Sequence, residues 1–359
     1  MFKCLEFKKN IKFLLAIALF GLLIPFYVSS MERFNPSCKK ILKNEIPKNI
    51  FEEDFAIYNG IRYPIISSGT EKFVYEYGSE YVLIKYKELY DSKNKIYFSN
   101  FSKELSCLIN LEHENIIKLI GCNEPDKILI EERASFNLNS FLSQSKSIGP
   151  KTKTKIAKDI ASGLAYMHAN DFVHRDLKLE NIVIFEQSKN GKKYVTAKII
   201  DFGYSNNCFK DSDYSKNNYA IGTIFYVDPR YWELYRVTSS TESQNIEYHK
   251  YSDIFAFGIL MYEIFYQLSV CEYYNSNVFS FNKKIRNMYS IKSFDFRKQV
   301  YVANAYVDEN WRPPLDDEKV DPKINDLIKR CWDNDPEKRP TAEQIVIELQ
   351  DYFNELNNN

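Results

Sequence analysis

Three side chains with metal-binding or proton-accepting chemistry lie within a short stretch of this chain. Asp176 and Asn181 are five residues apart, and Asp201 follows the apolar strand pattern Lys198-Ile199-Ile200. An Asp and an Asn at this spacing can face one site from a single loop, and a second Asp at a strand end can add a ligand. Carboxylate and amide oxygens suit Mg²⁺, and a carboxylate can orient an attacking hydroxyl. The set indicates phosphoryl transfer from a nucleotide.

The motifs that contain these residues, His-Arg-Asp-Leu-Lys-Leu-Glu-Asn at 174–181 and Asp-Phe-Gly at 201–203, resemble those of the protein kinase family in type and order. The resemblance implies that Asp176 is the catalytic base and that Lys178 steadies the γ-phosphate. It implies that Asn181 and Asp201 hold Mg²⁺. ATP and a protein substrate are the expected partners.

Upstream, the strand pattern Tyr81-Val82-Leu83-Ile84-Lys85 is similar to the strand whose Lys contacts the α- and β-phosphates in this family. Apolar residues at helical spacing predict an amphipathic helix over 101–111, which carries Glu104. Glu104 is the expected carboxylate partner of Lys85. The backbone near Glu131-Glu132-Arg133-Ala134 is expected to meet the adenine. The cofactor-binding set implied by the resemblance is Ile66, Gly69, Val74, Lys85, Glu104, Glu132 and Val183.

The loop that covers the phosphates departs from the family pattern. Only Gly69 and Val74 survive in the segment 67–74, and glycines are what let backbone N–H groups approach a phosphate. Leu83 stands where the family has a small Ala against the adenine, so we expect a bulkier pocket roof. These departures keep open a second class of function, a pseudokinase that acts as a nucleotide- or protein-binding scaffold with little catalysis.

Lys178 and Gly222-Thr223 favour Ser/Thr over Tyr acceptors, a pattern that dual-specificity kinases share. Cys331-Trp332 and Trp311-Arg312-Pro313-Pro314 resemble the tyrosine-kinase-like branch. Arg175 is typical of kinases that are controlled by phosphorylation of the activation segment. Candidate sites for that modification are Ser205, Ser212, Tyr214, Ser215 and Tyr219.

Arg230 replaces a Glu that in relatives pairs with a late Arg, here Arg339. Two like charges would repel one another in a buried place. We therefore expect Glu233, one helical turn on, to pair with Arg339, with Asp228 as the second candidate. On this reasoning Arg230 itself contributes little.

The pattern predicts an α+β, two-lobed protein kinase fold over residues 61–355. A small β-rich N-lobe with one main helix is expected at about 61–134, and a larger, mostly helical C-lobe at about 135–355. A hairpin through Asn190-Gly191 should join strands 182–185 and 194–200. The last helix is expected to begin at Thr341 with a capping box to Gln344.

The remaining regions are an apolar N-terminus and a polar linker. Residues 13–28 form an apolar run after several lysines, within a segment 1–30 that reads as either a signal peptide or a membrane anchor. We expect membrane association or entry into the secretory pathway, with the side of the membrane left open. Residues 31–60 are predicted to be a linker.

Composition adds few constraints on partners. The formal net charge is zero, so no global field favours nucleic acid. The seven cysteines show no metal-binding spacing and are typical of free thiols. The oligomeric state is left open.

Overall fold

The computed structural model describes residues 50–52, 54–91, 96–98, 100–144, 148–189, 191–207, 223–238, 250–277 and 302–358. The chain divides into two compact units. The first comprises the described residues up to Lys87 together with Leu119–Glu131, and the second comprises Glu88–Lys118 and the described residues from Glu132 onward.

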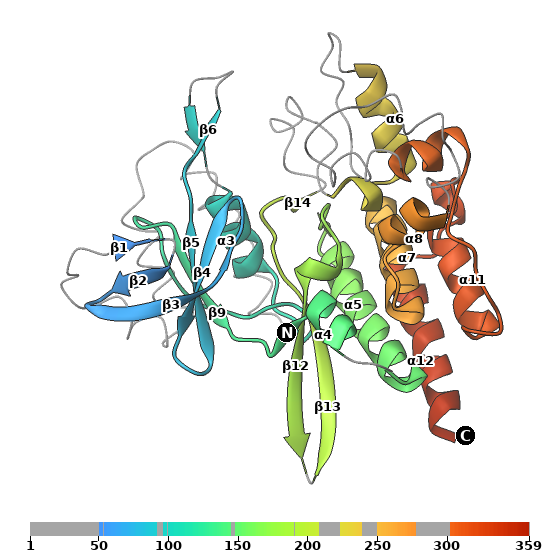
Figure 1. The fold of residues 1–359 in the computed structure, drawn as a ribbon, viewed down its shortest axis with the longest axis horizontal. Coiled ribbons are helices and arrows are strands. Elements are labelled where there is room, and N and C mark those ends of the chain that lie inside the picture. Colours follow the sequence, from blue (N-terminus) through green and yellow to red (C-terminus); the bar gives the residue numbers. More distant parts are fainter. Residues whose placement is uncertain are drawn as a thin grey trace, which may run out of the picture. The chain divides into compact units, whose positions relative to one another are not determined.

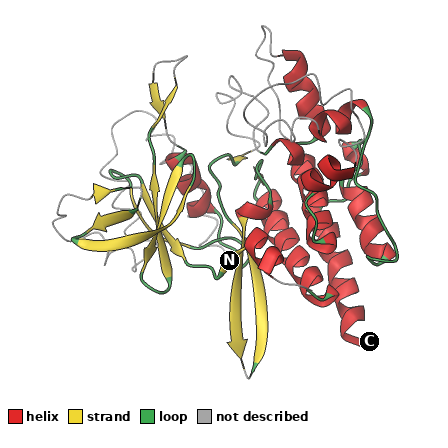
Figure 2. Cartoon of the chain, viewed as in Figure 1, coloured by secondary structure: helices red, strands yellow, loops and turns green. Residues whose placement is uncertain are grey.

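The first unit is built on one sheet (Figures 1 and 2). Its strand order is β1-β2-β3-β4-β5-β9-β8. The strands are β1 (Ile50–Phe51), β2 (Phe55–Tyr58), β3 (Ile61–Ser68), β4 (Lys72–Tyr77), β5 (Tyr81–Tyr86), β8 (Leu119–Asn123) and β9 (Ile128–Glu132). Aromatic and β-branched side chains, which favour strands, supply its core. The fully buried core cluster comprises Ala56, Tyr58, Tyr75, Leu83, Ile128 and Ile130.

The linker prediction is wrong at its C-terminal end. Residues 50–51 and 55–58 are strands, and β2 pairs antiparallel with β3 from Phe55↔Pro64 to Tyr58↔Ile61. Ala56 and Tyr58 alternate with more exposed neighbours, so β2 has one core face. The sheet therefore begins ahead of the predicted domain boundary at residue 61. The apolar run 13–28 and the rest of the predicted linker, residues 31–49, lie outside the described residues.

The second unit is mainly helical. Its helices are α3 (Phe101–Asn110), α4 (Leu138–Gln144), α5 (Pro150–Ala169), α6 (Pro229–Thr238), α7 (Lys250–Tyr266), α8 (Val270–Asn277), α11 (Pro322–Cys331) and α12 (Ala342–Asn358), with a further helix over 302–308. Its strands are β6 (Leu89–Asp91), β7 (Ile96–Phe98), β10 (Phe136–Asn137), β11 (Phe172–Val173), β12 (Ile182–Lys189), β13 (Lys192–Ile199) and β14 (Asn206–Asn207). A sheet-based first unit and a helical second unit confirm the α+β class.

The helix α7 is buried on all sides from Ser252 to Phe265. A helix that is apolar around its whole circumference belongs in the interior of a domain. The helix α5 passes close to β13, because a Cβ at Gly163 would lie 2.8 Å from the carbonyl oxygen of Asn115 and 2.9 Å from Ile199 Cδ1. Glycine at this position allows the close approach.

Two local predictions are confirmed in the second unit. β12 and β13 pair along their whole length, from Ile182↔Ile199 to Lys189↔Lys192, with Gly191 in the turn at φ +73°. At the start of α12, Thr341 N–H donates to Gln344 Oε1 (2.8 Å) and Gln344 N–H donates to Thr341 Oγ1 (3.3 Å). This exchange is the predicted capping box.

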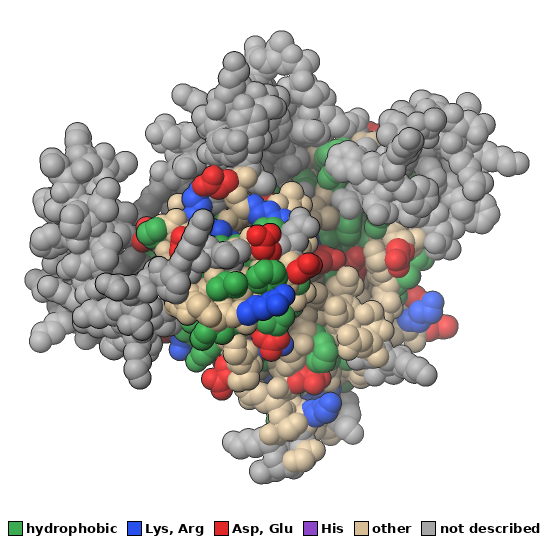
Figure 3. All heavy atoms as spheres, turned by 60° about the vertical axis from the view of Figure 1, so that its left-hand side comes forward, with side chains coloured by type: hydrophobic (Ala, Val, Ile, Leu, Met, Phe, Trp, Pro, Cys, Tyr) green, Lys and Arg blue, Asp and Glu red, His purple; other side chains and the backbone are tan. Residues whose placement is uncertain are grey.

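The surface carries charges of both signs. On the face drawn in Figure 3, the basic and acidic side chains of the described residues are interspersed, in keeping with the zero formal net charge. Among the residues that the structure describes, none of the helices is both long and apolar enough to cross a bilayer.

Candidate active site

Asp176 lies at the centre of a hydrogen-bonded loop between β11 and β12. Its Oδ1 accepts from the backbone N–H of Thr223 (2.9 Å) and from the Thr223 hydroxyl (3.3 Å). Its Oδ2 accepts from Lys178 Nζ (2.7 Å) and from Asn181 Nδ2 (2.9 Å). The side chain is buried, so four donors hold its carboxylate in one orientation. A carboxylate held in this way can accept a proton from a hydroxyl that replaces one of the donors.

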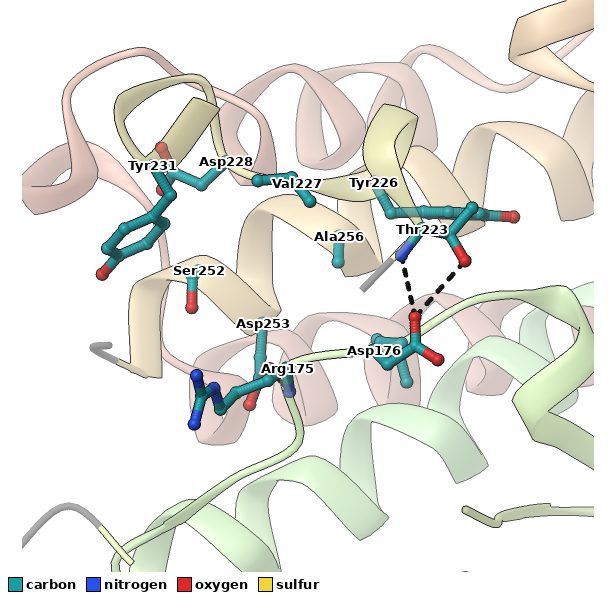
Figure 4. A pocket seen from close by; sticks show the side chains of 11 residues that line it. Arg175, Asp176, Thr223, Tyr226, Val227, Asp228, Tyr231, Ser252, Asp253 and Ala256 are labelled. Atoms are coloured by element: carbon teal, nitrogen blue, oxygen red, sulfur yellow. Dashed lines mark hydrogen bonds between the residues drawn. The ribbon is translucent and has the colours of Figure 1, made fainter. Parts of the chain in front are cut away.

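Thr223 joins this loop to the segment that begins at residue 223. Lys178 Nζ also donates to the Thr223 hydroxyl (3.0 Å), so Asp176, Lys178 and Thr223 form a closed set of contacts. Figure 4 shows Asp176 and Thr223 pointing toward one another beside a cavity of about 20 Å³, room for about one water molecule. The sequence linked Thr223 to substrate preference. Its contact with Asp176 was missed, because no spacing rule connects positions 176 and 223.

The buried Asp253 on α7 fixes the backbone of the catalytic loop. Its carboxylate accepts from the backbone N–H groups of His174 (2.8 Å) and Arg175 (2.9 Å), and it contacts His168 Nε2 at 2.9 Å. Burial alone would raise the pKa of Asp253, but His168, His174 and the Arg175 N–H outweigh burial and lower that pKa. The hydrogen bonds to this charged carboxylate thus offset the strain of a backbone bend in which Arg175 has φ +72°. A non-glycine residue in this region costs about 1–3 kcal/mol.

The two predicted metal ligands are joined through the backbone. Asn181 Nδ2 donates to the backbone oxygen (2.8 Å) and carboxylate of Asp176, which leaves its amide oxygen as the atom that could ligate a cation. The Asn181 carbonyl accepts from Ile200 N–H (2.9 Å), the residue directly before Asp201. Asp201 has φ +66°. One carboxylate and one amide oxygen fit Mg²⁺, which takes few protein ligands and completes its shell with phosphate oxygens and water.

Glu104, Glu132 and Val183 are other predicted site residues of the second unit. Glu104 is buried on α3, and a Cβ built at Gly203 would lie 3.8 Å from its Oε2, so its carboxylate adjoins the Asp-Phe-Gly motif. Glu132 accepts from Lys118 N–H (2.9 Å) and Lys198 Nζ (2.5 Å), and its own N–H donates to the Lys118 carbonyl (3.3 Å). Val183 pairs with Lys198 in the β12–β13 ladder. The pairing of Glu104 with Lys85 joins residues of different units and stays a prediction.

Lys85 lies on β5 of the first unit, on the same face as Leu83. Its Nζ donates to the Asp126 carbonyl and lies 5.0 Å from the centre of the Phe51 ring. Leu83 is fully buried among Ala56, Tyr58 and Tyr75. The expected roof residue is therefore a core residue, packed by side chains of the chain itself.

Val74 lies on the opposite face of the sheet from Lys85, and its assignment to the cofactor-binding set stays a prediction. Val74 pairs with Ile84 and Phe73 pairs with Lys85, and directly opposed residues share a face while neighbours along a strand alternate. The turn between β4 and β5 has three residues, so opposed residues differ by an even number, and the eleven-residue step from Val74 to Lys85 places them on opposite faces. Tyr75, which pairs with Leu83, occupies the Lys85 face in its place.

The expected phosphate-covering loop is a tight turn. Gly69 N–H donates to the Lys72 carbonyl (2.9 Å), and the Gly69 carbonyl accepts from Lys87 Nζ (2.6 Å). Ile66 lies in the irregular stretch of the β3–β4 ladder between Ile65 and Ser67 and is about half exposed. In this conformation the backbone N–H of Gly69 is therefore hydrogen-bonded within the turn.

Comparison with known proteins decides the family. The profile described as "Protein kinase domain" matches residues 68–350. The chain belongs to the protein kinase family.

Relatives of this kinase domain come from social amoebae and plants. It is 31% identical over 289 residues to "Probable serine/threonine-protein kinase gdt2" of Dictyostelium discoideum, covering 78% of this chain and 15% of that protein. It is 28% identical over 258 residues to "Serine/threonine/tyrosine-protein kinase HT1" of Arabidopsis thaliana, covering 70% of this chain and 54% of that protein. It is 24% identical over 286 residues to "Dual specificity protein kinase splA" of D. discoideum, covering 75% and 10%. The chain spans from a tenth to about half of these relatives' lengths.

The partner of Arg339 in the activation segment differs from the predicted one. Arg339 Nη1 pairs with Asp228 Oδ2, and neither side chain is exposed to solvent. Arg230 also donates to Asp228, from Nε (3.1 Å) and Nη2 (2.8 Å). Glu233 is exposed on α6. The predicted Glu233–Arg339 pair is thus wrong and the second candidate, Asp228, is confirmed.

Both arginines change the ionisation of Asp228. Burial alone would raise the pKa of Asp228, but the hydrogen bonds and charges of Arg230 and Arg339 outweigh burial and lower that pKa. Arg230 therefore has Asp228 as a carboxylate partner, which was not predicted from the sequence. Of the predicted phosphorylation sites, Ser205 donates to the His174 carbonyl (3.3 Å), and Ser212, Tyr214, Ser215 and Tyr219 lie outside the described residues.

Proposed function

We propose that this protein kinase is active and transfers the γ-phosphate of ATP to Ser and Thr hydroxyls of protein substrates. The observation that supports the proposal is the closed set of contacts among Asp176, Lys178 and Thr223. It combines a proton acceptor with a cation 2.7 Å away and a hydroxyl that contacts both. Relatives named as serine/threonine kinases and as dual-specificity kinases support the acceptor class and leave Tyr as a second acceptor.

The geometry suggests how an acceptor hydroxyl would be positioned. Asp176 already accepts four hydrogen bonds, about the capacity of a carboxylate. The longest is the 3.3 Å contact from the Thr223 hydroxyl. A substrate Ser or Thr would replace this hydroxyl, donate to Asp176 and lose its proton to it during attack. Lys178 would keep its contact with Asp176 and place its charge near the transferred phosphoryl group.

Asn181 and Asp201 would hold Mg²⁺ through their side-chain oxygens. The bound ion would neutralise charge on the phosphates of ATP. The chain's own contribution is to hold these oxygens in place, through the Asn181–Asp176 contacts and the Ile200–Asn181 backbone bond. The fixed orientation lowers the reorganisation needed when substrate binds.

The test is phosphoryl transfer by the purified chain to peptides that differ only in a Ser, Thr or Tyr acceptor. Asp176→Asn should lower turnover about 10²–10⁴-fold with nucleotide affinity nearly unchanged. Asp201→Asn should also weaken Mg²⁺-dependent ATP binding. Glu233→Gln, which changes an exposed carboxylate on α6, is the matched control and should change neither. Undiminished turnover in Asp176→Asn would refute the assignment of the base.

A pseudokinase remains the second candidate, because the Lys85 face of the first unit is filled by the chain's own side chains. Tyr75 and Leu83 are fully buried there, and Lys85 contacts Phe51 and the Asp126 carbonyl. A scaffold of this kind would show no transfer at saturating Mg·ATP, in the wild type or in any variant that binds the nucleotide. Measurable transfer that Asp176→Asn abolishes would decide for the enzyme.

A further inference from the structure

The first strand of the sheet, β1, lies against Lys85, the lysine that the family resemblance assigns to the phosphates of ATP. Phe51 is on β1, and three strands, β2, β3 and β4, lie between β1 and β5 in the sheet order. Its ring centre nevertheless lies 5.0 Å from Lys85 Nζ and 6.2 Å from the Tyr75 ring. The sheet must therefore curl so that β1 returns over the face that carries Lys85.

A second contact holds β1 in this place. The Tyr75 hydroxyl donates to the backbone oxygen of Glu52 (2.7 Å), and Tyr75 pairs with Leu83, two residues before Lys85. The Lys85 ammonium has three donor directions. One is used by the Asp126 carbonyl, and the Phe51 ring covers another side as a cation–π partner.

β1 can leave this position without unfolding the sheet. Among the described residues it is an edge strand of two residues, paired with β2 through Ile50↔Ile57 and Phe51↔Ala56. Glu52 N–H adds one backbone bond, to the Phe55 carbonyl (2.9 Å). Phe51 is only partly buried, whereas Ala56 and Tyr58 of β2 belong to the fully buried cluster. Short edge segments with few buried contacts open at low free-energy cost.

We propose that residues 50–52 form an autoinhibitory strap, which lies on Lys85 and must move away before the phosphates of ATP can bind this lysine. The inference rests on the proposed role of Lys85 in ATP binding. The strap lowers the apparent affinity for ATP by the fraction of molecules in which it is closed. A protein or modification that displaces Phe51 would activate the kinase.

The test compares Phe51→Ala with Phe55→Ala in the full chain. Phe55 is an aromatic residue of the neighbouring strand whose ring stacks on Arg62 (4.1 Å) and not on Lys85, so it is a matched control. Phe51→Ala should raise the affinity for Mg·ATP roughly five- to thirty-fold, the effect of losing one or two contacts of this strength. Phe55→Ala should leave it unchanged.

Adenosine, which lacks phosphates, is the control ligand, and its affinity should change little in Phe51→Ala. In a Lys85→Met background the gain from Phe51→Ala should disappear, because the two residues act on the same contact. Tyr75→Phe, which removes only the bond to Glu52, should give a smaller gain in the same direction with the fold intact.

Three outcomes would overturn the strap: no gain in Mg·ATP affinity for Phe51→Ala that melts like the wild type, an equal gain for adenosine, or a gain that persists with Lys85→Met. The strap is tested by binding and the proposed function by phosphoryl transfer, so failure of one proposal can be told from failure of the other. A chain that binds Mg·ATP more tightly on Phe51→Ala and yet transfers no phosphate keeps the strap and loses the activity.

Discussion

Replacing one oxygen atom of Asp228 by nitrogen should strongly destabilise this kinase. Asp228 and Arg339 are both fully buried, and Arg230 makes two further hydrogen bonds to the same carboxylate. Asp228→Asn keeps the shape of the side chain but removes the only negative charge in these contacts. Removing one partner of a buried ion pair costs about 3–5 kcal/mol, because the remaining charge is left uncompensated.

The cost should be measurable as a loss of thermal stability. At about 2–4 °C for each kcal/mol in a domain of this size, Asp228→Asn should lower the melting temperature by about 6–20 °C. Arg230→Ala should cost less than about 1 kcal/mol, since Arg230 is over a third exposed and Arg339 still neutralises Asp228. Glu233→Gln provides the exposed control on the same segment and should change nothing. Thermal and urea unfolding of the full chain measure both quantities.

The pH dependence gives an independent check. Because the folded-state pKa of Asp228 lies below its unfolded value near 3.9, the carboxylate stabilises the fold above that pH. This stabilisation is lost as the pH falls through the folded pKa. The wild type should therefore lose stability below about pH 4 more steeply than Asp228→Asn. A variant that melts within about 2 °C of the wild type at pH 7 would refute the claim that Asp228 carries the anchor.

Three other changes test the packing and ionisation described above. Leu83→Ala should destabilise the first unit by about 2–5 kcal/mol in urea unfolding, because it opens a cavity in a fully buried cluster. A cost below about 1 kcal/mol would contradict the burial of Leu83. Gly163→Ala should lower the free energy of unfolding by about 1–3 kcal/mol in the same assay, since its Cβ would overlap the Asn115 carbonyl. An unchanged unfolding midpoint would mean that α5 lies further from β13. Burial raises the pKa of Glu263 to about 8, so the folded state binds an extra proton between about pH 4.5 and 8 and stability falls as pH rises through that range. Glu263→Gln should flatten this part of the melting curve against pH, and an equal slope in the variant would place the titration elsewhere.

The sequence predicted what depends on local spacing. Asp176, Lys178 and Asn181 are in contact because they lie two and five residues apart on one loop, and such short separations limit which side chains can reach one another. The capping box at Thr341 and the β12–β13 hairpin were predictable for the same reason. In each case the decisive contact joins residues whose separation in the chain already limits their geometry.

The contacts that the sequence could not predict depend on whether a hairpin step is odd or even, or join residues that are far apart in the chain. A motif assigned Val74 and Lys85 to one cofactor-binding set, but it could not show which face of the sheet each occupies, because one residue more or fewer in a hairpin exchanges the two faces of a strand. Asp228 and Arg339 are 111 residues apart, and helical spacing within 228–233 could not show which carboxylate points inward. The strands of residues 50–58 were missed because their polar surroundings resemble a linker.

The brace that Asp253 provides ties the catalytic loop to the most deeply buried helix of the second unit. Since its carboxylate holds the backbone of His174 and Arg175, the loop cannot loosen without breaking contacts of α7 itself. On heating, phosphoryl transfer should then persist until the helical signal is lost, and the two losses should share one midpoint. Heat inactivation of the proposed activity would then report the unfolding of the helical unit.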